Sequence, residues 1–372
     1  MRRLCLALVV ASPLLLGASD GAWTFDLPAW APRPVVPADN PMSAAKIELG
    51  RRLFYDKRLS ITGDMACASC HEQALAFTDG QPTHRGVHGE PGIRNAMPLA
   101  NLAYLPTLTW SNPNIRRLED QVLIPLFGAR PVEMGLEGQE TVLFNRLSDD
   151  ADYRARFAAS FPEVDGKIDL SSITKALAAF LRSLTSFDSA YDRYKHGDAN
   201  ALSEAAKRGE ALFYGEALEC SHCHSGPIFT DNLKHQGLAF PESNFHNTGL
   251  YNLDGKGAYP TDNHGLREFT GAAEDEGKFR TPSLRNVALT APYMHDGSIA
   301  TLEAVVRDHY ARGGRASSSP AGQSPLRDPL IEAFPLSEKT VSDVVAFLKS
   351  LTDERFVTNP AYADPFNPTA SR

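Results

Sequence analysis

The chain has 372 residues, a net charge of −8 and a pI near 5.8. This acidic balance argues against a nucleic-acid partner; it bears on solubility and on encounter with partners rather than on the fold. No hydrophobic stretch beyond the N-terminus approaches the length of a membrane span. Removal of an N-terminal signal leaves about 350 residues, which is enough for two domains with their own cores.

The N-terminus has the pattern of a secretory signal. Arg2 and Arg3 precede an apolar run over 4–16, and small residues follow at 17–19. This order predicts a signal peptide over 1–22 and a periplasmic protein. A membrane anchor is the alternative, but the run is shorter than the ~20 residues that a spanning helix needs. We therefore expect Cys5 to leave with the signal, no membrane insertion after cleavage, and an extended arm over 23–40.

Two copies of the pentapeptide C-x-x-C-H use every cysteine except Cys5. In this motif two thiols attach haem covalently, and the adjacent imidazole becomes the proximal iron ligand. A zinc site or a thioredoxin-like dithiol is the alternative, but a zinc site needs four ligands and neither motif follows a hydrophobic strand. The sequence therefore predicts two covalent c-type haems. Their attachment residues are Cys67, Cys70 and His71 for haem iron 1, and Cys220, Cys223 and His224 for haem iron 2.

An internal repeat organises the chain around the two motifs. The segments LGRRLFY (49–55) and RGEALFY (208–214) precede the motifs, and AFLRSLT (179–185) and AFLKSLT (346–352) close the two halves. Apolar residues at three-to-four spacing predict that both closing segments are amphipathic helices, with Ser171 and Ser337 as N-caps. The stretch 226–277, rich in Gly, Asn, His and Pro, predicts long irregular loops.

The repeat predicts a mainly α protein with two cytochrome c-like domains, each with one covalent haem, joined by long irregular loops. We place the N-terminal domain at 41–200, the C-terminal domain at 201–356 and a C-terminal tail at 357–372.

Further motifs resemble a known family. AFTDG (76–80), RNA (94–96), LTW (108–110), PVEMG (131–135) and FRTPSLRNVALTAPYMHDG (279–297) occur in this order. With the haem motifs they are similar to the bacterial di-haem cytochrome c peroxidase/MauG superfamily, and the likeness runs from Ile47 to Thr352. Within it, FHNTGLY (245–251) and the chain length look most like the MauG-like MbnH di-haem enzymes. The resemblance implies a haem-dependent peroxidase or MauG-like oxidoreductase.

The resemblance also implies an open first iron that activates H2O2, which requires an acid/base group close to the distal side. The family's glutamate falls on Glu133. Gln121 is expected in the same pocket, and Pro125 near the distal face. Without the flanking PVEMG match, Glu133 alone would be interpreted as a solvated loop carboxylate.

The resemblance implies that the second iron stores an oxidising equivalent and has a protein side chain as its sixth ligand. That ligand is methionine in the peroxidases and tyrosine in MauG. No methionine occurs in the expected helix over 304–310. Tyr310 is therefore the expected sixth ligand of haem iron 2, with His309 and then Met294 as alternatives. A packed helix aromatic is the structural alternative for Tyr310.

Two further sites are carried by the resemblance. Trp110 matches the aromatic residue between the haems, which passes oxidation from one iron to the other; a core tryptophan is the alternative. The family also holds a calcium ion through an asparagine side chain and two backbone carbonyls, which map to Asn95, Thr290 and Pro292. Ligation by oxygen alone suits Ca²⁺.

The chain departs from the family at one position and leaves another open. Leu218 stands where MauG has a surface tryptophan that relays oxidation to its substrate. His88 lies near the position of the removable distal histidine of many peroxidases, and a loop histidine is the alternative.

These features predict an oxidoreductase that uses H2O2 to form a high-valent di-haem state and oxidises an aromatic residue, tryptophan first, of a periplasmic partner protein. The alternative is a di-haem cytochrome c peroxidase that reduces H2O2 to water with electrons from a small redox protein. A plain electron-transfer cytochrome would have no use for Glu133.

Overall fold

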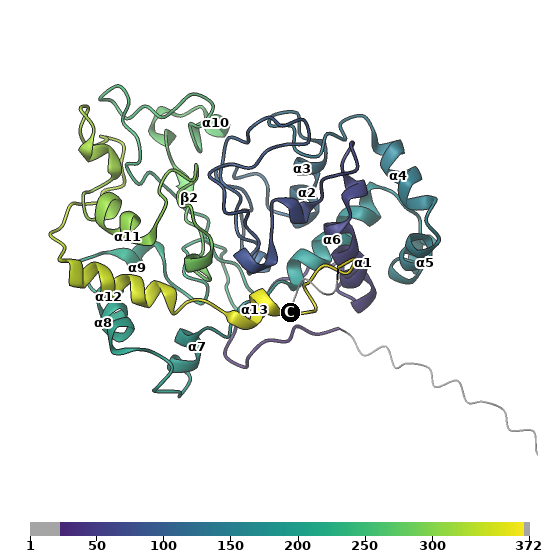
Figure 1. Ribbon diagram of the computed structural model, residues 1–372, viewed down its shortest axis with the longest axis horizontal. Helices are drawn as coiled ribbons and strands as arrows, with labels where there is room; N and C mark the ends of the chain where they lie inside the picture. The colour runs from purple at the N-terminus through teal and green to yellow at the C-terminus, as the bar shows by residue number, and fades with distance from the viewer. Residues whose placement is uncertain (1–22, 368–372) are drawn as a thin grey trace, which may run out of the picture.

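The computed structural model describes residues 23–367, so the predicted signal peptide and Cys5 lie outside the described residues. Helices make up most of the regular structure, which confirms the prediction of a mainly α protein. They form two groups that lie side by side (Figure 1). Within residues 23–367, no helix is long and apolar enough to cross a membrane.

The first group surrounds the first C-x-x-C-H motif and comes from the N-terminal half of the chain. Its helices are α1 (Ala44–Tyr55), α2 (Leu118–Gln121), α3 (Leu123–Phe127), α4 (Glu140–Ser148), α5 (Ala151–Ser160) and α6 (Leu170–Ser183). The core of this group is built from side chains between Ala31 and Phe187, and the rings of Phe54, Phe77 and Phe180 meet in it.

The second group surrounds the second motif and is separated from the first in Figure 1. Its helices are α7 (Ala190–Lys195), α8 (Glu204–Phe213), α9 (Cys220–Cys223), α10 (Arg267–Thr270), α11 (Leu302–Ala304), a π-helical turn η8 (Val305–Tyr310) and α12 (Glu338–Lys349). Two short strands, β1 (Phe245–His246) and β2 (Phe279–Arg280), pair antiparallel. Between 226 and 277 only β1, α10 and the short 3-10 helix η6 (Ala273–Asp275) interrupt the irregular backbone, as the composition predicted.

The sequence repeat corresponds to a repeated helix crossing. In the first group α1 packs on α6, and in the second α8 packs on α12. A Cβ atom at Gly50 of α1 would lie 1.9 Å from the Ala176 carbonyl oxygen of α6, and one at Gly209 of α8 would lie 1.9 Å from the Asp343 carbonyl oxygen of α12. The glycine in each copy of the repeat is therefore required by close backbone approach.

The predicted caps of the two closing helices have different outcomes. Ser337 caps α12, where its hydroxyl accepts from the Thr340 amide, so that prediction is confirmed. The prediction of Ser171 is wrong, because Ser171 already lies inside the first turn of α6. Asp169 precedes the helix in an extended conformation, and its carboxylate accepts from the Ser172 amide at 3.0 Å. A carboxylate at this position also suits the helix dipole.

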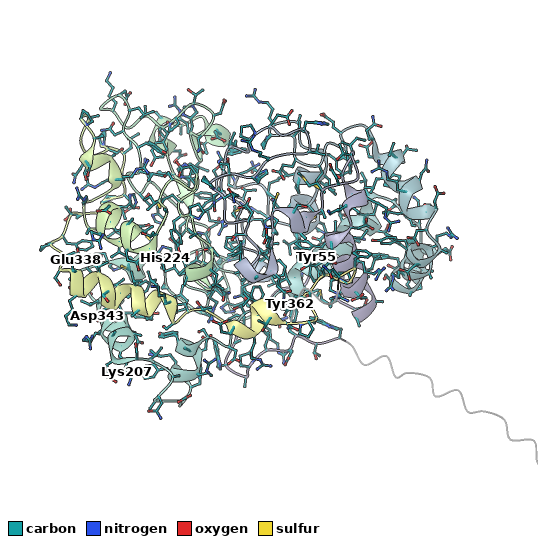
Figure 2. The ribbon with its side chains drawn as sticks, viewed as in Figure 1. Tyr55, Lys207, His224, Glu338, Asp343 and Tyr362 are labelled. Atoms are coloured by element: carbon teal, nitrogen blue, oxygen red, sulfur yellow. The ribbon has the colours of Figure 1, made fainter. Side chains whose placement is uncertain are left out.

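Both ends of the described chain pack against segments far away in sequence. After α12 the chain returns to the first group through α13 (Glu354–Thr358), where Phe356 contacts Phe77 with ring centroids 5.6 Å apart. The Tyr55 hydroxyl donates to the Tyr362 carbonyl at 2.8 Å, and Figure 2 shows the two residues close together. The arm over 23–40 has no helix or strand. The domain boundaries at 200 and 356 stay predictions.

Candidate haem sites

Each C-x-x-C-H motif opens onto its own cavity. The first-motif cavity, of about 90 Å³, is lined by the motif residues Cys67 and His71 and by apolar side chains of the first group. The second-motif cavity, of about 210 Å³, is lined by Cys220, Cys223 and His224 and by side chains from residues 279–310. His224 lies well inside the second group in Figure 2. Each half of the chain thus brings two thiols and an imidazole to an internal space.

The two motif histidines are oriented in the same way. The His71 Nδ1 lies 2.7 Å from the Phe77 carbonyl oxygen, and the His224 Nδ1 lies 3.1 Å from that of Phe229. Both phenylalanines have a positive φ, 64° and 54°, which non-glycine residues rarely adopt. A carbonyl acceptor fixes the proton on Nδ1 and leaves the Nε2 lone pair free for a metal. The repeated strained turn thus prepares each imidazole as a proximal iron ligand.

The motif thiols do not have the electrostatic environment of a redox site. Burial raises the pKa of Cys67, Cys70 and Cys220 to about 12. Thiol exchange needs a thiolate, which forms where positive charges lower the pKa. The buried thiols therefore favour the haem interpretation of the motifs over a reactive dithiol.

Gln121 and Pro125 line the first-motif cavity, whereas Glu133 is not among its lining residues. The Met134 amide donates to the Pro125 carbonyl at 2.9 Å, which sets the neighbouring Glu133 beside this cavity. The Val87 amide donates to the Glu133 carbonyl at 2.8 Å. A Cβ atom at Gly86 would lie 1.8 Å from the Val132 carbonyl oxygen, so the loop over 84–92 holds the Glu133 segment by backbone contact.

The first-motif cavity offers few side chains that could close an iron opposite His71. Among its described lining residues, Gln121 is an amide, and the Met97 sulfur accepts from the Arg280 guanidinium at 3.4 Å. His88 is exposed and lines neither cavity. The geometry therefore supports an open first iron and the loop-histidine interpretation of His88.

Tyr310, the expected sixth ligand, lines the second-motif cavity. Burial raises the pKa of its phenol. Tyr310 is the last residue of η8, and π-helical turns frequently occur at functional sites. His309 does not line the cavity: it is fully buried, and its Nδ1 accepts from the Arg315 amide at 2.9 Å. Met294 lines the same cavity, so the structure brings Tyr310 and Met294 to this space but not His309.

A single segment, residues 95–110, forms the wall between the two cavities. Met97 and Leu108 face the first-motif cavity, whereas Asn95 and Trp110 face the second-motif cavity. The Trp110 ring is buried, and its Nε1 donates to the Asn95 carbonyl at 2.9 Å. This hydrogen bond fixes the indole in the wall, the position that a bridge between two haems requires.

The three predicted calcium ligands line the second-motif cavity together. The Asn95 amide nitrogen donates to the Gln81 carbonyl at 2.8 Å, which leaves the Asn95 Oδ1 free to face a cation. The backbones of Thr290 and Pro292 approach the same space. The donor set is therefore compatible with Ca²⁺, which prefers oxygen ligands.

Sequence reasoning missed Arg280, whose guanidinium is buried in the cavity wall. It donates to the Thr109 and Thr281 carbonyls and to the Met97 sulfur. Arg280 makes no ion pair with any residue described here, and burial lowers its pKa to about 10. A buried cation is costly unless it is paired. The carboxylates of a haem would supply that partner, so the second-motif cavity fits haem in charge as well as in ligands.

Sequence reasoning also gave no role to His246, which lines the second-motif cavity. Its Nε2 lies 2.7 Å from an Asp231 oxygen and its Nδ1 lies 2.6 Å from an Asp328 oxygen. Two carboxylate acceptors require both ring nitrogens to carry protons, and with a contribution from Cys223 they raise the pKa of His246 to about 11. Cys223, Asp231 and His246 have the ligand types of a metal site. Because both imidazole nitrogens already contact carboxylates, we interpret the group as a buried ion pair.

Leu218, by contrast, is a buried wall residue of the second-motif cavity. The position therefore carries neither an aromatic ring nor an exposed side chain.

Comparison with known proteins decides the family. The family model of di-haem cytochrome c peroxidase matches residues 44–200. The cytochrome-c peroxidase IdrP1 of Pseudomonas sp. (strain SCT) is 36% identical over 93% of this chain and 92% of its own length. The methylamine utilization protein MauG of Methylophilus methylotrophus is 34% identical over 90% of this chain and 92% of its own length. The chain belongs to the di-haem cytochrome c peroxidase/MauG family.

A solved structure agrees with this assignment. A MauG-like protein associated with microbial copper homeostasis is 50% identical, with a TM-score of 0.89 over 93% of this chain and all of that one. The enzyme is therefore a haem-dependent oxidoreductase with two haems, and the resemblance seen in its motifs is confirmed. Family membership implies H2O2 as substrate.

Proposed function

We propose that this enzyme is a MauG-like oxidase of the periplasm that uses H2O2 to oxidise a tryptophan residue of a partner protein. The observation that carries the proposal is the contrast between the two cavities. Gln121 and Pro125 line the first-motif cavity and offer no strong iron ligand, whereas Tyr310 lines the second-motif cavity. One iron can then meet peroxide while the other is closed by a protein ligand.

The haems, attached through the four motif cysteines, would supply the redox chemistry by accepting two oxidising equivalents from peroxide. Glu133 would take a proton from bound H2O2 and deliver it to the leaving oxygen as the O–O bond breaks. Gln121 would orient the peroxide by a hydrogen bond. A positioned acid/base group of this kind contributes about 10²–10⁴-fold in rate.

Trp110 would connect the two sites, because its indole lies in the wall between the cavities. Tyr310 would stabilise an oxidised second iron, since a phenolate is an anionic ligand. A calcium ion held by Asn95, Thr290 and Pro292 would fix the wall that carries Trp110, because the Asn95 carbonyl accepts from the indole.

The reaction balances with a protein as reductant. Reduction of H2O2 to two waters consumes two electrons and two protons. The partner's indole would supply both as one water molecule adds to the oxidised ring, so that the net products are a hydroxylated tryptophan and one water. The alternative, supported by relatives named cytochrome-c peroxidase, draws the same electrons from a small redox protein.

The test is to mix the fully oxidised enzyme with one equivalent of H2O2 and no reductant, and to follow the spectra of both haems by stopped-flow. A MauG-like oxidase should react with H2O2 under these conditions, and the spectrum of its second haem should change. A tryptophan-containing peptide added afterwards should increase in mass by one oxygen atom, while the enzyme spectrum returns to that of the resting state. A peroxidase instead stays unreactive until a small redox protein reduces it. That second result would overturn the proposal.

A further inference from the structure

A second titratable side chain lies beside Glu133. The His84 Nε2 is 3.3 Å from the Glu133 Oε1, and both side chains are largely shielded from solvent, with 13% and 27% of their surface exposed. His84 is 49 residues away in sequence, on the loop that holds the Glu133 backbone. Its Nε2 makes no hydrogen bond to any residue among 23–367, so the ion-pair contact with Glu133 is the polar contact found for this nitrogen. The imidazole is therefore aimed at the carboxylate alone.

The backbone holds the His84 ring in this position. The Gly92 amide donates to the His84 carbonyl at 2.7 Å. A Cβ atom at Gly92 would lie 2.6 Å from the His84 Cε1 and 2.9 Å from its Nδ1, so the ring lies flat against the glycine. A side chain at position 92 would displace the ring from Glu133. The contact is therefore built into the fold of the loop.

The charges around His84 favour its protonated form. The Glu133 carboxylate is the main cause that raises the pKa of His84, burial opposes it, and Asp79 adds a weaker attraction. Because the folded pKa is raised, the imidazolium is present below the ordinary value of 6.5 and is lost as the pH rises through the folded value.

We propose that His84 is the proton relay of the peroxide site: it orients Glu133 for cleavage of the O–O bond, and through Glu133 it supplies a proton of the water formed as the enzyme returns to its resting state. The inference rests on the proposed role of Glu133. During O–O cleavage Glu133 moves a proton of H2O2 to the leaving oxygen, which completes the first water without an outside proton. The second water, formed as the partner's two electrons arrive, needs two protons; one would pass from His84 Nε2 to Glu133 Oε1 and on to that oxygen, and the other would come from solvent. His84 regains its proton from solvent, and the two electrons come from the partner. His84 is thus a positioning residue, because it acts on peroxide through Glu133.

The experiment compares four variants of the haem-loaded enzyme. His84→Gln keeps a hydrogen-bond donor but cannot titrate. Gly92→Ala displaces an unaltered imidazole. Glu133→Gln removes the acid/base group, and His88→Gln changes an exposed histidine on the same loop. The rate of reaction with H2O2 is measured by stopped-flow from acid to alkaline pH, together with the resting spectrum of each variant.

We expect the wild-type rate to fall on the alkaline side with an apparent pKa above 6.5, as the imidazolium is lost. His84→Gln and Gly92→Ala should both be slower by roughly 10–100-fold, the range for partners of a metal-site group, and His84→Gln should lack the alkaline fall. His88→Gln should match the wild type. All resting spectra should be unchanged.

Three results would overturn the inference. A His84→Gln enzyme with the wild-type rate and pH profile would show that solvent protonates Glu133 directly. A change of spin state in His84→Gln would show that His84 is an iron ligand. An unchanged rate in Glu133→Gln would remove the role of Glu133 itself, and with it the proposed function of this site. If only Glu133→Gln is slow, the proposed function survives and the relay does not.

Discussion

The two cavities are built from the same sequence unit but differ on the side that faces the motif histidine. Both have two thiols and an imidazole held by the carbonyl of a positive-φ phenylalanine, and both lie beside the same glycine-mediated helix crossing. Opposite the imidazole, the first offers Gln121 and the approach of Glu133, whereas the second offers Tyr310 on a π-helical turn. The residues that hold the haem are therefore common to both copies of the repeat. The two sites differ in the side chains that line the rest of each cavity, and we expect these side chains to determine the function of each haem.

The largest expected effect is the loss of one haem. Cys220→Ser with Cys223→Ser should halve the covalent haem per chain, because each motif attaches its own, and Cys67→Ser with Cys70→Ser should do the same. Pyridine haemochrome assays and intact mass measure the haem content. A full complement of covalent haem in either double variant would mean that the motifs do not attach haem.

Glu133→Gln tests the distal side of the first cavity. The amide keeps the size of the side chain but cannot shuttle a proton, so the reaction with H2O2 should slow by about 10²–10⁴-fold. The second haem of the resting enzyme should be unaffected, since Glu133 lies at the first cavity. Stopped-flow spectra report both. A wild-type rate in Glu133→Gln would mean that Gln121 or water, rather than Glu133, moves the proton during O–O cleavage.

Trp110→Phe tests the wall that connects the two cavities. The first cavity should still react with H2O2, but oxidation should reach the second haem more slowly, because phenylalanine is much harder to oxidise than indole. The lost Nε1 hydrogen bond to Asn95 should lower the free energy of unfolding by about 0.5–1.5 kcal/mol. Equal defects at the same kinetic step in Trp110→Phe and Glu133→Gln would contradict the bridging role.

The smallest expected effects are those of substitutions at the helix crossings that the two halves share. Gly50→Ala and Gly209→Ala each place a Cβ atom against a facing backbone oxygen, so each should lower the free energy of unfolding by about 1–3 kcal/mol. Thermal or denaturant unfolding measures both. Strongly unequal losses would show that the two crossings are not equivalent in the folded protein.

The sequence predicted the parts of the fold that repeat at short range. The predicted helices over 179–185 and 346–352 correspond to the ends of α6 and α12, which stop at Ser183 and Lys349, two and three residues before the segments do. Ser337 is the cap that its position indicated. Ser171 failed as a cap because Asp169, two residues earlier, offers a stronger acceptor. Local pattern therefore gave the helices, and competition between neighbouring cap residues set the exact end.

The sequence could not predict the polar contacts between residues that are joined by long loops. His246 meets Asp328 82 residues further along the chain, and His84 meets Glu133 through a loop with no regular structure. The buried charge of Arg280 depends on two segments far apart in sequence, 95–110 and 279–281, which meet at the wall between the cavities. No periodicity relates such residues, since only the folded backbone brings them together.

The central claim is that one iron is open and the other is closed by Tyr310. Electron paramagnetic resonance of the resting ferric enzyme, alone and with Tyr310→Phe, tests it most directly. The account predicts one high-spin and one low-spin signal, with only the low-spin signal altered by Tyr310→Phe. Two low-spin signals would contradict the claim that one iron is open. A low-spin signal that is unchanged in Tyr310→Phe but altered in Met294→Leu would contradict ligation by Tyr310.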